Sequence, residues 1–299
     1  ISAKNRAEQP VHVQIEVVGA ALQDRGDSQL WRMSRLRWLN SKLGINDLPT
    51  SAYLPIRRNG LNLAVKSGKI NLSNSGLPAS VWVHGNELLG VPIDFTLEKA
   101  KGIKEQPLFD AAKNPVKFTK SATGLVGWEK RSEYKDYSMI LSGELASDGY
   151  LHYKIHILPK IDFWSTNTSL NLHMNKSFST YFMGMGYGRG NGMGGGKTPA
   201  SYDWKWKGPQ NSYWIGNYNG GIYCKLLGAT YTGPLLNLYH PLPPPSWYNQ
   251  NAGGFNLISN DQGTQSSVYA GKRQFKKDSA IDFEFSLLIT PVKELNTKI

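Results

Sequence analysis

A chain of 299 residues, of which 40% are hydrophobic and 19% charged, can bury a sizeable core, and this composition excludes an intrinsically disordered protein. No run of about 18 apolar residues occurs, which excludes a membrane-spanning helix. The net charge of +12 is typical of proteins that bind nucleic acid, anionic lipid or an acidic polysaccharide. The lysines are nevertheless spread along the chain without a nucleic-acid motif, so we expect a solvated basic surface and no nucleic-acid partner.

The first part of the chain contains several candidate strands. Apolar and polar residues alternate over 11–18, which predicts a half-buried strand. Over 31–39, two tryptophans and an arginine recur at helical spacing, which indicates a short helix or an ordered loop. Three strand-length segments follow, each bounded by Gly, Asn, Ser or Pro, at 61–65, 81–83 and 91–97. Residues 101–115 are polar and are expected to form a loop.

The remaining strands are predicted in a second series, rich in aromatic and β-branched residues and separated by turn signals. They are 125–130, 134–145, 150–158, 169–174, 255–259, 265–270 and 281–289. Asp148 and Gly149 mark a hairpin turn between two of them. Amphipathic helices are nearly absent. The sequence therefore predicts an all-β protein, a large antiparallel β-sandwich over 1–299 with long loops rich in glycine and aromatic residues.

Residues 181–248 are the most unusual stretch, because a glycine run at 184–196 is followed by many aromatic rings. We expect long loops at one end of the sandwich, whose flat rings could contact a sugar or a neighbouring domain. The alternative is that these rings belong to the core. In an extended segment Trp204 and Trp206 would share one face, opposite Lys205. The candidate contact residues are Tyr187, Arg189, Trp204, Trp206, Trp247 and Tyr248.

The sequence contains no complete motif for catalysis, for a cofactor or for a metal site. Residues 194–198 resemble the end of a phosphate-binding loop but lack its first glycine and its helix. His152 and His156 fall in an alternating strand, where four residues span about 13 Å, too far for one zinc ion. The single cysteine, Cys224, lies in a predicted strand and is expected to be a buried structural thiol. No catalytic residue, cofactor or metal site is expected.

Several stretches resemble the region N-terminal to the catalytic barrel in proteins related to glycoside hydrolase family 123. These stretches are 31–41, 182–186, 204–206, 214–226 and 287–293. The resemblance implies a β-sandwich that precedes a (β/α)₈ barrel, in a protein that hydrolyses β-linked N-acetylgalactosamine. In that family the sugar's own acetamido group attacks, and an adjacent Asp-Glu pair in the barrel assists. This chain contains no Asp-Glu pair, so no catalytic residue is carried over.

Three functions are compatible with these observations. The first is a non-catalytic sandwich that supports the barrel and contributes to glycan binding. Its partners would be the glycan or the barrel, in an extracellular, periplasmic or cell-surface location. The chain begins at Ile1 with no secretory segment, which suggests a mature product or a piece of a longer protein. The second is a free-standing carbohydrate-binding protein, and the third is a complete enzyme, such as a polysaccharide lyase, with a site between the sheets.

Overall fold

The computed structural model describes residues 10, 12–16, 18–21, 42, 44–108, 114–188, 194–206, 210–229 and 243–292. The chain divides into two units, Ile1–Asn46 and Asp47–Ile299. All of the strands described below belong to the second unit. No helix among the described residues is long and apolar enough to cross a membrane.

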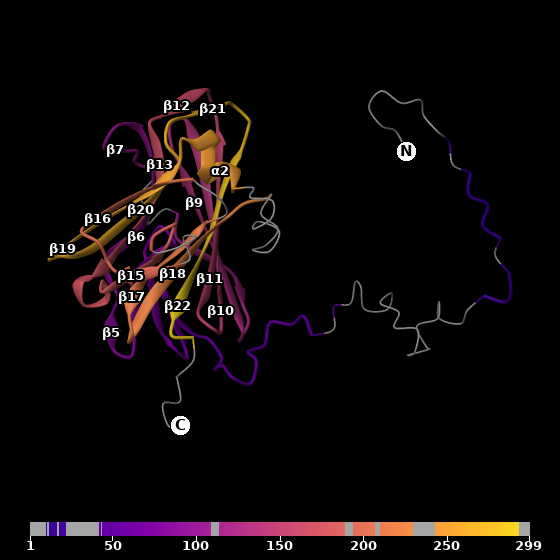
Figure 1. Cartoon of the computed structure of the whole chain (residues 1–299), viewed down its shortest axis with the longest axis horizontal. Coiled ribbons are helices and arrows are strands. Elements are labelled where there is room, and N and C mark those ends of the chain that lie inside the picture. The colour runs from indigo at the N-terminus through magenta and orange to yellow at the C-terminus, as the bar shows by residue number, and fades with distance from the viewer. Residues whose placement is uncertain are drawn as a thin grey trace. The chain divides into compact units, whose positions relative to one another are not determined.

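Two large antiparallel sheets make up most of the second unit (Figure 1). The nine-stranded sheet has the order β15 (Gly195–Lys197), β14 (Tyr181–Gly184), β17 (Ser212–Asn217), β18 (Gly220–Leu227), β22 (Ile281–Thr290), β11 (Tyr150–Pro159), β10 (Tyr137–Ala146), β9 (Leu125–Glu133) and β8 (Lys117–Ser121). The six-stranded sheet has the order β16 (Ser201–Lys205), β19 (Gly254–Asn260), β20 (Gly263–Tyr269), β13 (Asn167–Asn175), β6 (Leu89–Ala100) and β7 (Ile103–Lys104).

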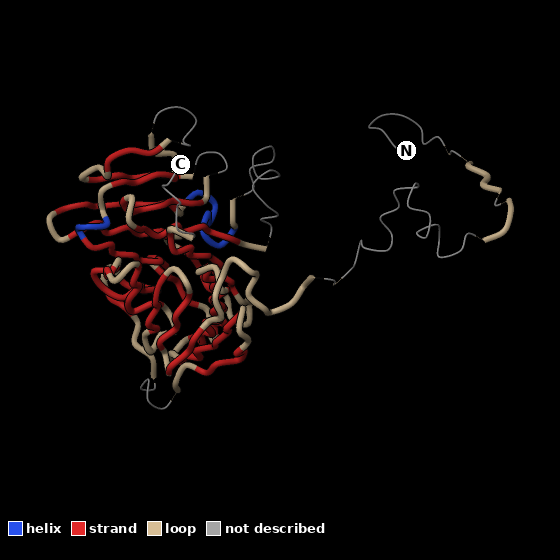
Figure 2. Tube along the Cα trace, turned by 90° about the horizontal axis from the view of Figure 1, so that it is seen from below, coloured by secondary structure: helices blue, strands red, loops and turns tan. Residues whose placement is uncertain are grey.

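Smaller elements complete the unit. A five-stranded sheet is formed by β1 (Arg57–Asn59), β2 (Asn62–Val65), β3 (Gly68–Leu72), β4 (Pro78–Val83) and β5 (Asn86–Glu87). A two-stranded sheet is formed by β12 (Phe163–Ser165) and β21 (Arg273–Phe275). Among the described residues, helix is confined to α2 (Pro245–Tyr248) and the 3₁₀ turns η4 (Lys176–Phe178) and η5 (Asn249–Asn251), as Figure 2 shows.

The core lies between the two large sheets, because strand alternation places one apolar face of each sheet inside. Phe182 on β14 stacks on Phe255 of β19, with ring centroids 5.6 Å apart. Phe283 on β22 contacts Phe95 of β6 edge-to-face at 5.4 Å. These contacts join strands of different sheets, so the expected antiparallel β-sandwich with little helix is confirmed.

Most of the predicted strands are present, with boundaries within a few residues. The hairpin turn is also confirmed, because Asp148 Oδ1 accepts the Tyr150 N–H at 2.9 Å and Gly149 has a φ of 88°. The segment 101–115 is not wholly loop, since β7 pairs with β6. The predicted helix at 31–39 lies outside the described residues.

Two expectations from the sequence are wrong. Residues 12–16 and 18 form no strand, and Val13 and Ile15 remain 74% and 80% exposed. Alternation alone does not make a strand where the backbone has no pairing partner. The stretch 181–248, expected mainly as loops, contains the five strands β14 to β18, of which only the strand around Cys224, β18, was predicted. Its glycines allow rings to lie directly on the sheet, and Gly216 and Gly221 both lie under the Trp214 ring.

Candidate functional site

The outer faces of the two large sheets differ in chemistry. On the nine-stranded sheet, charged side chains of β11 and β22 pair with each other across the strands. Lys154 Nζ and His156 Nδ1 contact Asp282 at 2.8 and 2.7 Å, and His152 Nε2 contacts Glu284 Oε1 at 2.7 Å. This confirms the expected polar strand face and leaves those charges satisfied within the domain.

The six-stranded sheet instead presents a row of short polar side chains across five of its strands. Register places the members of this row, here called the amide row, directly opposite one another: Asp203, Asn256, Ser267, Asn171 and Asp94. Their neighbours in sequence, such as Phe255 and Val268, point the other way and are buried in the core. Alternation and strand pairing therefore bring to one surface residues that are far apart in the sequence, such as Asp94 and Ser267.

Hydrogen bonds hold the centre of the amide row in place. Asn171 Nδ2 donates to Thr96 Oγ1 at 3.1 Å and lies 3.3 Å from Ser169 Oγ, and the two hydroxyls are 3.0 Å apart. Thr96 and Ser169 are buried, so the Asn171 amide is oriented from beneath. Its Oδ1 atom accepts no hydrogen bond from another described residue and can meet a ligand.

Other side chains on this face have unused hydrogen-bonding capacity. Asn256, Ser267, Gln265 and His173 make no side-chain hydrogen bond with any other residue that the structure describes, and all are at least partly exposed. They line a groove of about 680 Å³. The volume lies within the usual range for small-molecule sites, about 300–1,000 Å³. At one end of the groove Lys104 pairs with Asp94.

The nine-stranded sheet carries a second unusual surface, an apolar row at the end opposite its ion pairs. The row, here called the apolar stripe, consists of Met183, Trp214, Tyr223, Leu288 and Tyr150. Met183 is 47% exposed and Tyr150 37% exposed, and the other members are half-buried. Trp214 is fixed because its Nε1 donates to Thr290 Oγ1 at 2.9 Å.

The tryptophans predicted to contact ligand are buried. Trp204, Trp206 and Trp247 are 7%, 8% and 0% exposed and belong to the core. Lys205 points to the opposite, exposed side, as the spacing predicted. The structure thus supports the core alternative for these rings, because β16 and α2 turn their apolar sides toward the space between the sheets.

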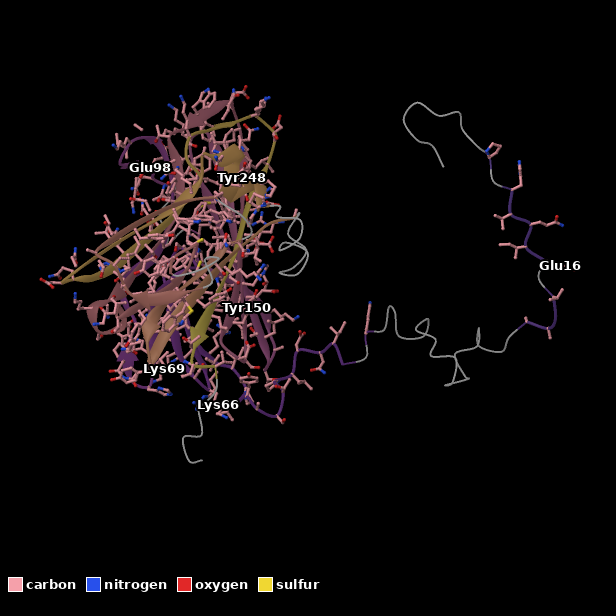
Figure 3. The ribbon with its side chains drawn as sticks, viewed as in Figure 1. Glu16, Lys66, Lys69, Glu98, Tyr150 and Tyr248 are labelled. Carbon is pink, nitrogen blue, oxygen red and sulfur yellow. The ribbon has the colours of Figure 1, made fainter. Side chains whose placement is uncertain are left out.

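The structure brings only some of the predicted residues together. Trp206 contacts Trp204 at 5.0 Å and Tyr248 at 6.2 Å, both edge-to-face. Trp247 lies elsewhere, against Phe283, and donates its Nε1–H to the Glu284 carbonyl. Half-buried Tyr187 donates to the Lys197 carbonyl at 3.0 Å. Tyr248 also lies far from Tyr150 of the apolar stripe (Figure 3).

Arg189 lies outside the described residues, so its role stays a prediction. The amide row was not identified from the sequence, although a signal exists. Polar residues occupy every second position of 167–175, namely Asn167, Ser169, Asn171, His173 and Asn175. Neutral amides and hydroxyls in such a pattern, instead of lysine and glutamate, distinguish this face from an ordinary solvated one.

Cys224 behaves as expected of a structural thiol. It is fully buried, and burial raises its pKa to about 12 although a hydrogen bond with Tyr213 opposes this shift. Among the residues that the structure describes, no group of three or more His, Cys, Asp or Glu side chains could hold a metal ion.

Comparison with known families gives one match that covers most of the chain. The family described as Glycoside hydrolase 123, third domain, matches residues 56–291. This is the family that the sequence stretches resemble. The expected position of the domain was wrong, however, because the family description numbers it third and does not place it at the N-terminus. No curated protein matches the sequence.

Solved structures with a similar fold have very different sequences. One is a protein from Escherichia coli K12 provisionally described as an aldose 1-epimerase, with 9% identity, a TM-score of 0.46, and coverage of 79% of this chain and 99% of that one. Another is a galactose mutarotase related enzyme from Lactobacillus acidophilus, with 7% identity, a TM-score of 0.44, and coverage of 81% and 98%. Heparan sulfate lyase HepC from Pedobacter heparinus has 10% identity and a TM-score of 0.43, with 88% of this chain and 41% of the lyase covered.

Proposed function

Because this chain belongs to the glycoside hydrolase 123 third-domain family, we propose that it is a non-catalytic module that holds a glycan on the outer face of its six-stranded sheet. The observation that carries this proposal is the amide row, in which the neutral side chains of Asn256 and Ser267 have no hydrogen-bond partner within the described residues. By resemblance, the whole protein hydrolyses β-linked N-acetylgalactosamine outside the cytoplasm, at the cell surface or in the periplasm or extracellular space.

The chemistry of the groove suits sugar hydroxyls. Asn171 offers its Oδ1 as an acceptor, the Asn256 amide offers both a donor and an acceptor, and Ser267 offers either. The exposed side chain of Ile258 also lines the groove and can contact the apolar side of a sugar ring. Recognition would thus come from the sheet face instead of the buried tryptophans.

A binding experiment tests this role. Asn256→Ala and Ser267→Ala remove no side-chain hydrogen bond within the described part of the domain, so folding stability should change little. Each should weaken binding of an oligosaccharide ending in β-linked N-acetylgalactosamine about tenfold, equivalent to about 1.4 kcal/mol. Ser142→Ala, on the outer face of the other large sheet, is the matched control and should bind normally. Isothermal titration calorimetry measures the affinities. The proposal is contradicted if the natural protein and all three variants bind the oligosaccharide with equal affinity.

The apolar stripe supports a second role, contact with a neighbouring domain of the same protein. Exposed apolar rows of this kind usually mark interfaces. A domain numbered third in its family has neighbouring domains in the same polypeptide, and this makes a neighbouring domain the most direct occupant. The catalytic barrel implied by the resemblance is the one we propose.

Limited proteolysis of the full-length protein tests this contact. Leu288→Asp should expose the connection between this domain and its neighbour and accelerate cleavage there. Ser142→Asp, on the same sheet but away from the stripe, is the control. The contact is ruled out if both full-length variants are cleaved at the rate of the natural protein.

A further inference from the structure

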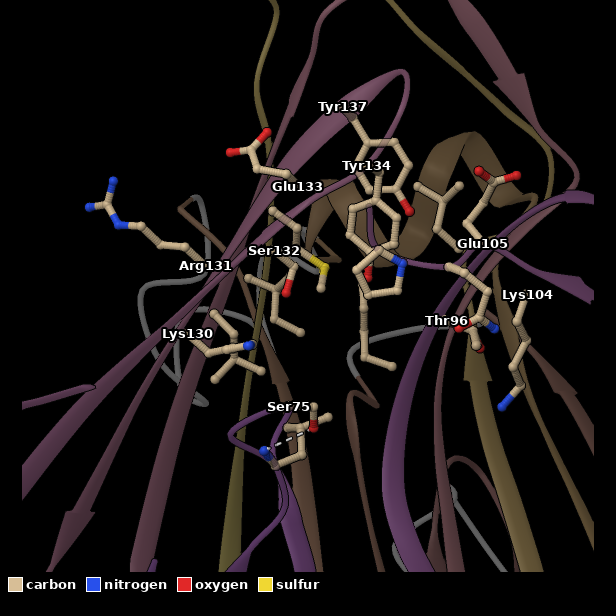
Figure 4. A pocket seen from close by; sticks show the side chains of 18 of the residues that line it. Ser75, Thr96, Lys104, Glu105, Lys130, Arg131, Ser132, Glu133, Tyr134 and Tyr137 are labelled. Carbon is tan, nitrogen blue, oxygen red and sulfur yellow. Dashed lines mark hydrogen bonds between the residues drawn. The ribbon is translucent and has the colours of Figure 1, made fainter. Parts of the chain in front are cut away.

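A second cavity, of about 280 Å³, lies between the two large sheets, beside β6 and β9 (Figure 4). Its walls include Leu77, Phe95 and Met139, and its rim includes Asn74 and Gln106. In Figure 4, Lys130 lies on one side of this cavity and Lys104 and Glu105 on the other. The cavity borders the groove of the amide row, because Asp94, Thr96 and Lys104 line both.

Lys130 occupies a position that normally holds an apolar residue. On β9 the side chains of Trp128, Lys130 and Ser132 all point between the sheets, and Lys130 pairs in register with the core residue Leu141. Lys130 is only 7% exposed. Most of its side chain is therefore shielded from water, and its partly buried ammonium lies at the wall of the cavity.

This ammonium has no counter-charge among the described residues. The other basic residues that line the cavity are paired, Lys104 with Asp94 and Arg131 with Glu129. Lys130 Nζ donates only to the backbone carbonyl of Asn114, although an ammonium has three N–H donors. Burial lowers its pKa, which is the direction expected for a desolvated ammonium. A buried cation without an anion destabilises a protein unless something else supplies the negative charge.

We infer that this cavity binds a sugar residue with a single negative charge, whose carboxylate or sulfate group contacts Lys130. One unpaired cation matches one negative charge, whereas a dianion would leave net charge buried. The volume suits a single sugar ring, which the apolar wall of Leu77, Phe95 and Met139 would contact. The net charge of +12 would attract acidic glycans to the domain. This inference does not depend on the amide row.

Calorimetric titration with three probes tests the inference: glucuronate, glucose 6-sulfate and glucose. We expect at least one acidic sugar to bind about tenfold or more tightly than glucose, and comparison of the two acids identifies the preferred group. Lys130→Met keeps most of the side-chain volume without the charge and should abolish this preference. Lys69→Met removes an exposed lysine of β3 and should retain it.

Further measurements separate this cavity from the other sites and from a structural role. Lys130→Met should fold and be at least as stable as the natural protein, because it removes an uncompensated buried charge. Asn256→Ala should leave acidic-sugar binding unchanged. In the unsubstituted protein, amide chemical shifts of Ser132 and Tyr137 should move with glucuronate or glucose 6-sulfate. The inference is overturned by equal binding of acidic and neutral sugars, by unchanged binding in Lys130→Met, by loss of acidic-sugar binding in Asn256→Ala, or by unmoved shifts at both residues.

Discussion

The indole ring of Trp214 lies directly on Gly221 of the neighbouring strand, so that a Cβ atom at Gly221 would come within 2.6 Å of two ring atoms. Real Cβ atoms essentially never approach this closely. The glycine is therefore required for close packing and not for an unusual backbone angle, and Trp214 keeps its place in the apolar stripe because of it.

Gly221→Ala should lower the free energy of unfolding by about 1–3 kcal/mol, the usual effect of overpacking. Gly196→Ala is the control, because the nearest atom to its Cβ would be 3.9 Å away. Thermal unfolding followed by calorimetry measures both. Combination with Trp214→Ala should remove only part of the penalty of Gly221→Ala, because the Cβ atom would still lie 2.7 Å from the Ile215 carbonyl oxygen. Equal effects of Gly221→Ala in the presence and absence of the ring would contradict this explanation.

Trp204→Ala and Trp206→Ala should each destabilise the domain by about 3–5 kcal/mol, since both rings are buried in the core. Trp164→Ala, at a site that is 55% exposed, should have a much smaller effect. Chemical denaturation gives the three values. If Trp204→Ala and Trp206→Ala unfold like the natural protein but lose glycan binding, the rings contact ligand and the core assignment is wrong.

The pair formed by Lys154 and Asp282 should make stability depend on pH in acid. Partial burial alone would raise the pKa of Asp282, but hydrogen bonds from Lys154 and His156 outweigh it and the pKa falls below its usual 3.8. A carboxyl whose folded pKa is lowered stabilises the protein above its unfolded pKa, and this stabilisation disappears as the pH falls through the folded pKa. The exposed pair should contribute about 1 kcal/mol or less.

Asp282→Asn should therefore be less stable than the natural protein near pH 6 and equally stable well below pH 3.8. Denaturant unfolding at a series of pH values measures the difference. A double-mutant cycle with Lys154→Met assigns it to the pair. A difference that stays constant over the whole pH range would show that Asp282 acts through something other than its charge.

Cys224 should not react with thiol reagents at pH 8 while the domain is folded, because its pKa is about 12 and it is fully buried. Reaction with a chromogenic disulfide should therefore proceed at the rate of unfolding. In denaturant the Cys224 thiol should react as fast as the thiol of a small unstructured compound. Rapid modification of the native protein would place the thiol at the surface.

The sequence by itself determined the fold class and the direction of many side chains. In 150–158 the alternation predicted that His152, Lys154 and His156 share a polar face, and the structure confirms this. A strand places successive side chains on opposite sides whatever its partners are, so such predictions need only local information. Trp204 and Trp206 were correctly placed on one face for the same reason.

Tertiary structure alone decided which face meets the core and which strands become neighbours. Val13 and Ile15 alternate with polar residues and form no strand, whereas Phe182 and Tyr213, in a segment rich in glycine, belong to strands in the core. Burial of Trp204 and Trp206 depends on the opposing sheet, and the amide row depends on pairing of β13 with β6 and β20. Strand register is fixed by contacts between distant segments, and local residue patterns contain no information about which distant segment will supply them.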